Sequence, residues 1–210
     1  MPQVPKAVVS RLSLYLRELH RLARDGKETI SSTQLGKLLG CTAAQVRKDM
    51  ANFGQFGYPG VGYRCAELVT AIKQIMGTHQ PWSVALVGIG NLGQALLGYR
   101  GFTDQGFRIV AAFDLDPHLI GTDVQGIPVF AVDELASVIR EQSIRLAILA
   151  VPSSAAQEMA DELTKAGIEG ILNFAPVTLS HPPSVHTVGV DLAIELEQLS
   201  FAVVNKRQNS

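Results

Sequence analysis

Three glycines in the pattern Gly-x-Gly-x-x-Gly give the clearest chemical signal in this 210-residue chain. Gly88, Gly90 and Gly93 follow an apolar run of strand length, residues 83–87, and precede a stretch of helical character, residues 94–99. In this order the first glycine permits a tight turn, the second lets the backbone approach a pyrophosphate, and the third lets the helix pack closely on the strand. The free N–H groups at the start of the helix attract the anion. We therefore predict a dinucleotide site at Gly88, Ile89, Gly90, Asn91, Leu92 and Gly93.

An acidic residue stands where such a site needs one. Asp114 ends a second predicted strand, residues 107–113, and lies 21 residues past Gly93. At this spacing a carboxylate binds the ribose hydroxyls and repels a 2′-phosphate, so the sequence favours NAD(H) over NADP(H). Two later strand ends are expected to line the same crevice. They place Val151, Pro152, Asn173 and Phe174 there.

The same region offers no group to carry out a reaction on a substrate. It contains no Tyr-x-x-x-Lys pair, and His181 and His186 fall in a proline-containing segment without an evident carboxylate partner. Five scattered histidines and two distant cysteines do not have zinc-ligand spacing. Residues 81–210 have room for the cofactor fold and little more, so the nucleotide is interpreted as a signal, and we predict that the protein is not an enzyme, with no catalytic or metal site.

A second chemical signal lies in the first part of the chain. Two S/T-x-x-Q motifs, which end in Gln34 and Gln45, are candidate capping boxes for short helices at 32–39 and 43–53, with a turn at Gly40 between them. Two helices joined by a tight glycine-containing turn predict a helix-turn-helix. An earlier amphipathic helix is expected at residues 10–24.

The second of these helices has one apolar face and one face suited to DNA. Val46, Met50 and Phe53 recur at helical spacing and should face the core. The residues that point outward are Ala44, Gln45, Arg47, Lys48 and Ala51. Gln45 is suited to base edges, and Arg47 and Lys48 to phosphates or guanine. The alternative is a solvated basic helix face.

The next segment favours the DNA-binding interpretation. In residues 54–64, Pro59-Gly60 suits a type II turn and aromatic residues flank it, which predicts a short hairpin. A helix at 66–76 then completes a winged helix-turn-helix, and residues 78–81 are the expected linker.

Charge and composition agree with a two-part chain. Residues 1–80 hold eleven Lys+Arg and five Asp+Glu, net +6, whereas residues 81–210 hold seven and fourteen, net −7. Hydrophobic residues make up 47% and charged residues 18%, which is typical of a globular protein. The N-terminus lacks the apolar region of a secretory signal, no apolar run is long enough for a membrane span, and only two cysteines occur, so we expect a cytoplasmic protein without membrane contact.

The alternation of strands and helices predicts an α/β fold with a doubly wound parallel sheet after the winged helix. The expected domains are 1–80 (winged-helix, DNA-binding), 81–190 (Rossmann type, NAD(H)-binding) and 191–210 (interface helix and tail). The last helix, 191–204, is apolar on two sides. A partner subunit would bury it, through exchange of the helix. The alternative is packing across its own sheet.

These motifs together resemble the family of redox-sensing transcriptional repressors called Rex. The resemblance rests on Ser10-Arg11-Leu12, Tyr15-Leu16-Arg17, Ser32-x-x-Leu35-Gly36, Thr42 to Asp49, Gly60-Val61-Gly62-Tyr63, Gly88-x-Gly90-Asn91-Leu92-Gly93-x-Ala95-Leu96 and Ile171 to Pro176. It implies a homodimer with swapped C-terminal helices, which binds an inverted-repeat operator when NADH is scarce and releases it when NADH binds.

The resemblance also implies roles for individual residues. With the outward residues of the second helix, the expected DNA contacts are Ser10, Arg11, Tyr15, Arg17, Thr42, Ala44, Gln45, Arg47, Lys48, Gly60 and Tyr63. The expected switch is an exchange in which Asp191 pairs with Arg17 in one state and with Tyr99 in the other. Many members of the family have basic residues at the wing tip, where this chain has Tyr58-Pro59. Arg64 would substitute for them, or Tyr58 would act by packing.

Three other interpretations remain open at this point. One is a small NAD-dependent enzyme with a helical appendage. Another is a CoA-binding module, because residues 151–176 also resemble the CoA-binding domain of succinyl-CoA ligases. The third is a thiol sensor that uses Cys41 or Cys65.

Overall fold

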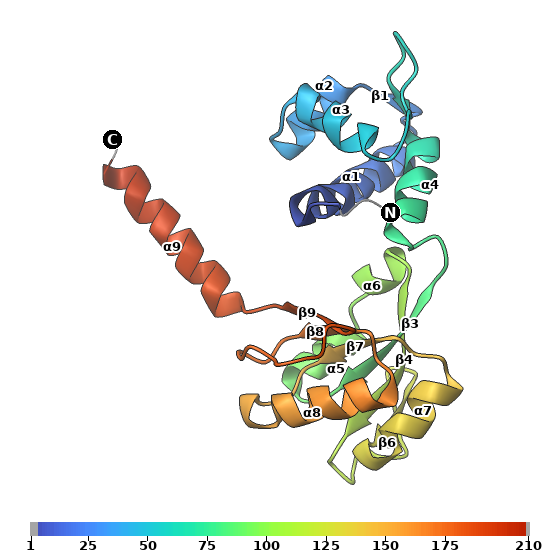
Figure 1. The fold of residues 1–210 in the computed structure, drawn as a ribbon, viewed down its shortest axis with the longest axis vertical. Coiled ribbons are helices and arrows are strands. Elements are labelled where there is room, and N and C mark those ends of the chain that lie inside the picture. The colour runs from blue at the N-terminus through green and yellow to red at the C-terminus, as the bar shows by residue number, and fades with distance from the viewer. Residues whose placement is uncertain (1–3, 209–210) are drawn as a thin grey trace. The chain divides into compact units, whose positions relative to one another are not determined.

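The computed structural model describes residues 4–208 of the chain. Contacts divide it into two compact units, Met1–Gln80 and Pro81–Ser210. Figure 1 shows the helical first unit in blue to green and the second unit, built around a sheet, in green to red. Within the described residues no helix is long and apolar enough to cross a membrane.

The first unit is a helix-turn-helix with a small sheet. Its elements are α1 (Lys6–Arg24), β1 (Thr29–Ile30), α2 (Ser32–Leu39), α3 (Ala43–Ala51), β2 (Tyr63–Arg64) and α4 (Cys65–Met76). The prediction for α2 is confirmed, and α3 ends at Ala51 rather than at Phe53. Gly40 ends α2 with a φ of 68°, a left-handed conformation that glycine adopts without steric cost.

The core of this unit forms where the apolar stripes of the helices meet. Its fully buried members include Leu12 and Leu19 of α1, Leu35 of α2, Val46 of α3 and Ile72 of α4. The stripe predicted for α3 thus faces inward at Val46 and Met50. The opposite face of α3 is consequently left on the surface.

The wing turn has the predicted geometry. The Val61 N–H donates to the Tyr58 carbonyl at 3.1 Å, Gly60 has a φ of 76°, and Tyr58 pairs with Gly62 across the turn. These are the marks of a type II turn with glycine at its third position. The strand β1, which the sequence did not indicate, pairs antiparallel with β2 at the base of the hairpin.

The second unit is a seven-stranded sheet in the order β5-β6-β4-β3-β7-β8-β9. The strands are β3 (Trp82–Val87), β4 (Phe107–Asp114), β5 (Asp123–Val124), β6 (Ile127–Ala131), β7 (Leu146–Leu149), β8 (Gly170–Asn173) and β9 (His186–Gly189). All neighbours are parallel except β5 and β6. This is the predicted doubly wound sheet, in the strand order of a dinucleotide-binding fold.

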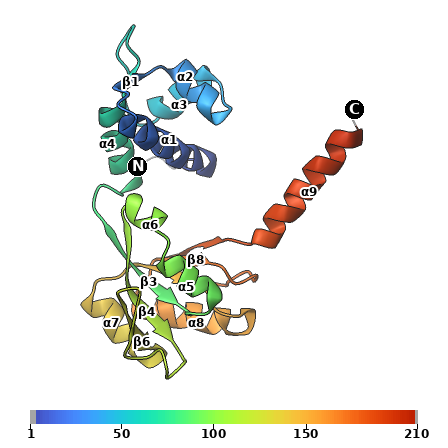
Figure 2. The same ribbon diagram turned by 180° about the vertical axis from the view of Figure 1, so that it is seen from behind.

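Helices cover both faces of the sheet. The helical elements of this unit are α5 (Asn91–Leu97), α6 (Gly101–Asp104), the 3₁₀ turn η1 (Val132–Glu134), α7 (Leu135–Glu141), α8 (Ser153–Ala166) and α9 (Leu192–Gln208). Figures 1 and 2 show α7 and α8 on one face and α5 and α6 on the other. Along β3, Ala85 and Val87 belong to one buried cluster and Val84 and Leu86 to the other, as the alternation of a strand between two layers requires.

Several local predictions for this unit are wrong. The sequence predicts that Asp133 caps a helix that runs to about Glu141, but the helical stretch begins ahead of Asp133, with η1 at Val132, and the Glu134 carboxylate accepts the Ala131 N–H at 3.0 Å. His186 lies on β9 rather than in a loop. Helix α5 ends at Leu97, so Tyr99 lies beyond it.

Helix α9 leaves its apolar side chains exposed within one chain. Leu196 is 67% exposed and Phe201 is 69% exposed, and Leu192, Leu199 and Val203 are also exposed. The helix therefore does not pack across its own sheet, contrary to the alternative considered from the sequence.

Candidate nucleotide site and nucleic-acid interface

The carboxyl edge of the sheet brings the predicted cofactor residues together. Val87, Phe113, Leu149 and Asn173 lie in one row across β4, β3, β7 and β8. The residues that follow them continue the row, because Gly88 N–H donates to the Phe113 carbonyl at 2.9 Å and equivalent bonds join β7 to its neighbours. The connections leave β3 and β7 in opposite directions, so this edge is the switch point where such folds bind ligands.

Each glycine of the fingerprint has a distinct steric role. A Cβ on Gly88 would lie 2.6 Å from the Ala150 carbonyl oxygen, and one on Gly93 would lie 2.0 Å from the Gly88 carbonyl oxygen. These two glycines therefore let loop and helix pack against the strands. A Cβ on Gly90 meets nothing within 4 Å, so this glycine faces open space. A cradle with closed sides and one open position fits a pyrophosphate.

Asp114 fixes the cradle to the end of β4. Its Oδ2 accepts the Ile89 N–H at 2.6 Å, and its Oδ1 accepts the N–H groups of Leu115 at 2.8 Å and Asp116 at 2.9 Å. A carboxylate has about four acceptor positions. One therefore remains on this half-buried group, which suits a ribose hydroxyl.

The main chain rather than the side chain of Ile89 belongs to this site. Its side chain is buried in the core, at 2% exposure, so only its main chain is available to a ligand. Asn91 and Leu92 are exposed in the first turn of α5. Their exposure leaves this turn open to a ligand.

Asn173 shapes the crevice from within. Its side chain is buried and donates to the carbonyls of Ala175 at 3.1 Å and Val177 at 2.9 Å, while it accepts the Ala175 N–H at 3.0 Å. Its amide is therefore committed to the loop that follows β8, and it holds that loop beside the half-buried Phe174.

Val151 and Pro152 follow the end of β7 at the same edge of the sheet. The Val151 Cγ1 lies 3.0 Å from a Cβ built on Gly88, so these two predicted residues are adjacent. Pro152 is exposed and precedes the first turn of α8. In the described part of the chain no group of three metal-ligating side chains occurs.

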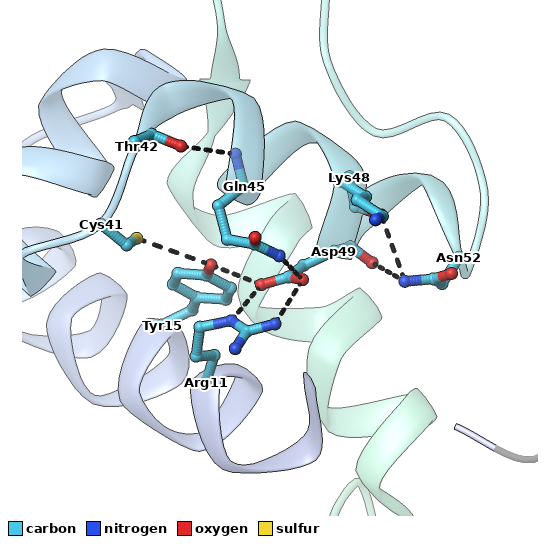
Figure 3. Close-up of polar contacts among 8 residues, drawn as sticks. All are labelled: Arg11, Tyr15, Cys41, Thr42, Gln45, Lys48, Asp49 and Asn52. Carbon is cyan, nitrogen blue, oxygen red and sulfur yellow. Dashed lines mark hydrogen bonds and ion pairs between the residues drawn. The ribbon is translucent and has the colours of Figure 1, made fainter. Parts of the chain in front are cut away.

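In the first unit, a buried carboxylate organises the helix predicted to read DNA. Figure 3 shows Asp49 of α3 between Arg11 and Tyr15 of α1 and Gln45 of its own helix. Asp49 accepts two bonds from Arg11 at 2.6 and 2.8 Å, one from the Tyr15 hydroxyl at 2.8 Å and one from Gln45 Nε2 at 2.8 Å. Asp49 is fully buried, so these four bonds replace its hydration. No pattern in the sequence indicates this role of Asp49.

These contacts keep the carboxylate ionised. Burial favours the neutral acid, but the hydrogen bonds from Arg11, Tyr15 and Gln45 outweigh it and lower the pKa of Asp49 below its usual value. Burial and the bond to Asp49 raise the pKa of Tyr15 in turn, so the tyrosine remains a donor. The network thus ties α1 to α3 through a charged centre with matched partners.

Three predicted DNA contacts have other roles in this structure, two of them within the Asp49 network. Tyr15 is fully buried, so it holds Asp49 and its predicted contact with DNA is wrong for this structure. Arg11 makes two hydrogen bonds to the same carboxylate, and its side chain is 27% exposed. Its charge is therefore largely neutralised inside the unit. Tyr63 is buried at 6% exposure, and burial raises its pKa, so it supports the hairpin rather than faces DNA.

The other predicted contacts are on the surface. Ala44, Arg47 and Lys48 are exposed on α3, and Arg47 donates to the Ser32 hydroxyl at 3.0 Å. Thr42 caps α3 by accepting the Gln45 N–H at 3.1 Å. Ser10, Arg17 and Gly60 are also exposed. A basic helix face beside the start of α2 suits a phosphate and a groove.

The wing combines packing with charge. Arg64 lies over the Tyr58 ring, 5.1 Å from its centroid, and also pairs with Glu67 at 3.2 Å. The Tyr58 hydroxyl donates to Glu67 at 3.0 Å. Tyr58 therefore acts by packing against Arg64. Arg64 provides a positive charge at the wing, which Glu67 partly neutralises.

The three predicted switch residues lie in separate surroundings. Arg17 is exposed and approaches Glu18 at 3.7 Å. Tyr99 is 59% exposed and packs edge-on against Phe102. Asp191 caps α9, since its Oδ1 accepts the Ala193 N–H at 2.9 Å.

The two units match known protein families separately. A family model described as CoA binding domain matches residues 79–177. A second, described as "Putative DNA-binding protein N-terminus", matches residues 3–51. The winged helix-turn-helix and the Rossmann-type sheet thus define a class of regulator that joins DNA binding to nucleotide binding.

Comparison over the whole chain identifies the family within this class. The redox-sensing transcriptional repressor Rex of Desulfitobacterium hafniense is 49% identical over 205 residues, 98% of this chain and 98% of that protein. The repressor of the same name from Desulforamulus reducens is 45% identical over 206 residues, again 98% of each chain. The chain belongs to the Rex family of redox-sensing transcriptional repressors.

Solved structures agree with this assignment. The crystal structure of RSP in complex with β-NAD⁺ and operator DNA matches with a TM-score of 0.91 and 35% identity, over 99% of this chain and 96% of that chain. RSP in complex with β-NADH matches with a TM-score of 0.88 and 34% identity, over 99% and 98%. These relatives are repressors rather than enzymes, as predicted from the missing catalytic groups.

Proposed function

We propose that this protein is a cytoplasmic repressor that binds operator DNA when NADH is scarce and leaves it when NADH binds. The observation that carries the proposal is the cradle of Gly88, Gly90 and Gly93 beside Asp114, in a chain whose family includes a protein solved with NAD⁺ and operator DNA. The nucleotide acts here as a signal.

The cofactor residues contact different parts of the nucleotide. The open position at Gly90 admits the pyrophosphate to the N–H groups at the start of α5. The remaining acceptor of Asp114 takes a ribose hydroxyl, and its charge disfavours a 2′-phosphate. The loop held by Asn173, with Val151 and Phe174, closes the crevice toward the nicotinamide end.

The DNA-binding residues likewise contact different parts of the operator. Gln45 and Lys48 face base edges, and Arg47 contacts phosphate beside Ser32. Two copies of this surface are needed to match an inverted repeat. The exposed apolar face of α9 supports a homodimer in which each α9 packs on the partner subunit. In this proposal Asp191, which caps the start of this helix, pairs with Arg17 in one state and with Tyr99 in the other.

The test is a gel retardation titration with an operator duplex selected from a randomised library. NADH is expected to release the DNA at lower concentration than NAD⁺ or NADPH. Release that does not depend on the nucleotide, or the absence of any selected sequence, would refute the proposal.

A CoA-binding module is the second candidate, because the CoA binding domain model matches residues 79–177. Calorimetry with CoA and NADH separates the two functions, and tighter binding of CoA would favour this candidate. The thiol-sensor interpretation has less support, because burial raises the pKa of Cys65 and so lowers its reactivity.

A further inference from the structure

The two S/T-x-x-Q motifs of the first unit use their glutamines differently. The Gln34 side-chain oxygen accepts the Ser31 N–H at 3.0 Å, which completes the predicted capping box. Gln45 does not complete the second box, because its Nε2 donates to Asp49 at 2.8 Å instead. Asp49 lies one helical turn beyond Gln45, whereas Leu38 occupies the equivalent place after Gln34.

The contact fixes which end of the Gln45 amide faces outward. An ionised carboxylate accepts hydrogen bonds and donates none, so the amide must turn its nitrogen toward Asp49. The bonds from Arg11 and Tyr15 hold this carboxylate in place. Figure 3 shows the Gln45 oxygen directed away from Asp49. Among the residues that the structure describes, no group donates to that oxygen.

We propose that Asp49 fixes the Gln45 amide with its oxygen outward, so that this oxygen accepts a hydrogen bond from the exocyclic amine of a base in the major groove. This inference rests on the proposed function. Adenine N6 and cytosine N4 are donors in the major groove, whereas thymine O4 and guanine O6 are acceptors. An unrestrained glutamine rotates its amide to suit either set. Gln45 is restrained, because rotation would place its oxygen against a carboxylate oxygen.

The position of Gln45 on α3 suits this role. It is the third residue of the helix, and the first turn of a recognition helix contacts base edges. Lys48, one turn further, offers only donors. Gln45 therefore selects a base that donates a hydrogen bond, and Lys48 selects a base that accepts one. The order of these two residues along α3 fixes the orientation of the helix in the groove.

The experiment uses the full-length protein without NADH and a duplex selected from a randomised library. Competition with all four base pairs at each position gives the preference of the wild-type protein. Gln45→Met keeps the size of the side chain and removes its polar atoms, so the position that loses its preference is the one that Gln45 reads. At that position we expect adenine and cytosine to be favoured over thymine and guanine on one strand, by roughly tenfold.

Two variants test whether Asp49 sets the preference. Asp49→Asn replaces the acceptor with a group that also donates, so Gln45 can rotate, and the preference is expected to fall to about twofold or threefold. Tyr15→Phe is the matched control, because it removes another bond to Asp49 and leaves the bond to Gln45. It should keep the preference even if overall affinity falls.

The outcomes separate this inference from the proposed function. If no duplex is selected, the proposed function fails. If a duplex is selected but Gln45→Met changes no position, or the changed position prefers thymine or guanine, the inference is wrong. It is also wrong if Asp49→Asn keeps the full preference. If Asp49→Asn does not fold, an analogue base without the exocyclic amine decides: it should weaken binding of the wild-type protein by about tenfold and leave Gln45→Met unchanged, and equal loss in both proteins refutes the inference.

Discussion

Substitution of Gly90 by alanine should weaken the binding of NADH without lowering the stability of the fold. The added Cβ meets no protein atom within 4 Å, and the backbone φ of −66° is one that alanine adopts freely. The free energy of unfolding is therefore expected to stay the same or to rise by about 0.5 kcal/mol, since alanine restricts the unfolded chain. The methyl group nevertheless occupies the space through which a pyrophosphate approaches the backbone.

The effect on binding can be estimated from the cost of overfilling a close contact. Such contacts cost about 1–3 kcal/mol, which corresponds to NADH affinity roughly 5-fold to 150-fold weaker. Isothermal titration calorimetry with NADH measures this change, and urea denaturation measures stability on the same preparation.

Two further glycines provide controls. Gly93→Ala places its Cβ 2.0 Å from the Gly88 carbonyl oxygen, so it should destabilise the protein by about 3 kcal/mol before any ligand is added. Gly189→Ala adds a methyl group in open space on the outermost strand and should change neither the NADH affinity nor the stability. If Gly90→Ala binds NADH as tightly as the wild-type protein, the pyrophosphate does not lie on this loop and the assignment of the cradle is wrong.

Four other outcomes follow from the same contacts. Asp114→Ala should weaken NADH binding and narrow the preference over NADPH, and calorimetry that finds both affinities unchanged would place the ribose elsewhere. Arg47→Ala should weaken binding to every DNA sequence and lower the salt slope by about one, whereas Lys48→Ala should relax sequence preference, and mobility shifts at several salt concentrations distinguish the two. Asp191→Ala removes the cap of α9, worth about 1 kcal/mol, and should blunt NADH-induced release of DNA while NADH affinity stays within a few-fold; release at the wild-type NADH concentration would exclude Asp191 from the switch. Because the folded-state pKa of Asp49 is lowered, the unfolded chain takes up its proton first, so this group's stabilisation is present at neutral pH and lost as the pH falls below roughly 5; a urea titration in which Asp49→Asn shows the same pH dependence as the wild type would contradict this.

The sequence determined the class of fold and the principal sites because their signals are local. The glycine spacing, the apolar runs of strand length and the type II turn at Pro59-Gly60 each depend on a few consecutive residues. The steric demands they reflect are those found at Gly88 and Gly93. A spacing of 21 residues sufficed to find Asp114, because strand and helix lengths in this fold vary little.

Other features depend on contacts between segments far apart in the chain. The strands β6 and β9 were missed because Pro128 interrupts the pattern of one and the other is short and largely exposed at the sheet edge. The alternation that marks a half-buried strand is weak in both. Their pairing partners, rather than their own residues, make them strands.

The tertiary structure alone decided what Asp49 does. In the sequence it is one acidic residue in a basic helix, 38 positions from Arg11. Folding brings Arg11 and Tyr15 of α1 against it, and the burial of its charge among these donors follows from the packing of α1 on α3. The same packing takes Tyr15 out of reach of DNA and turns the Gln45 amide, because a buried carboxylate must be satisfied by whatever donors surround it.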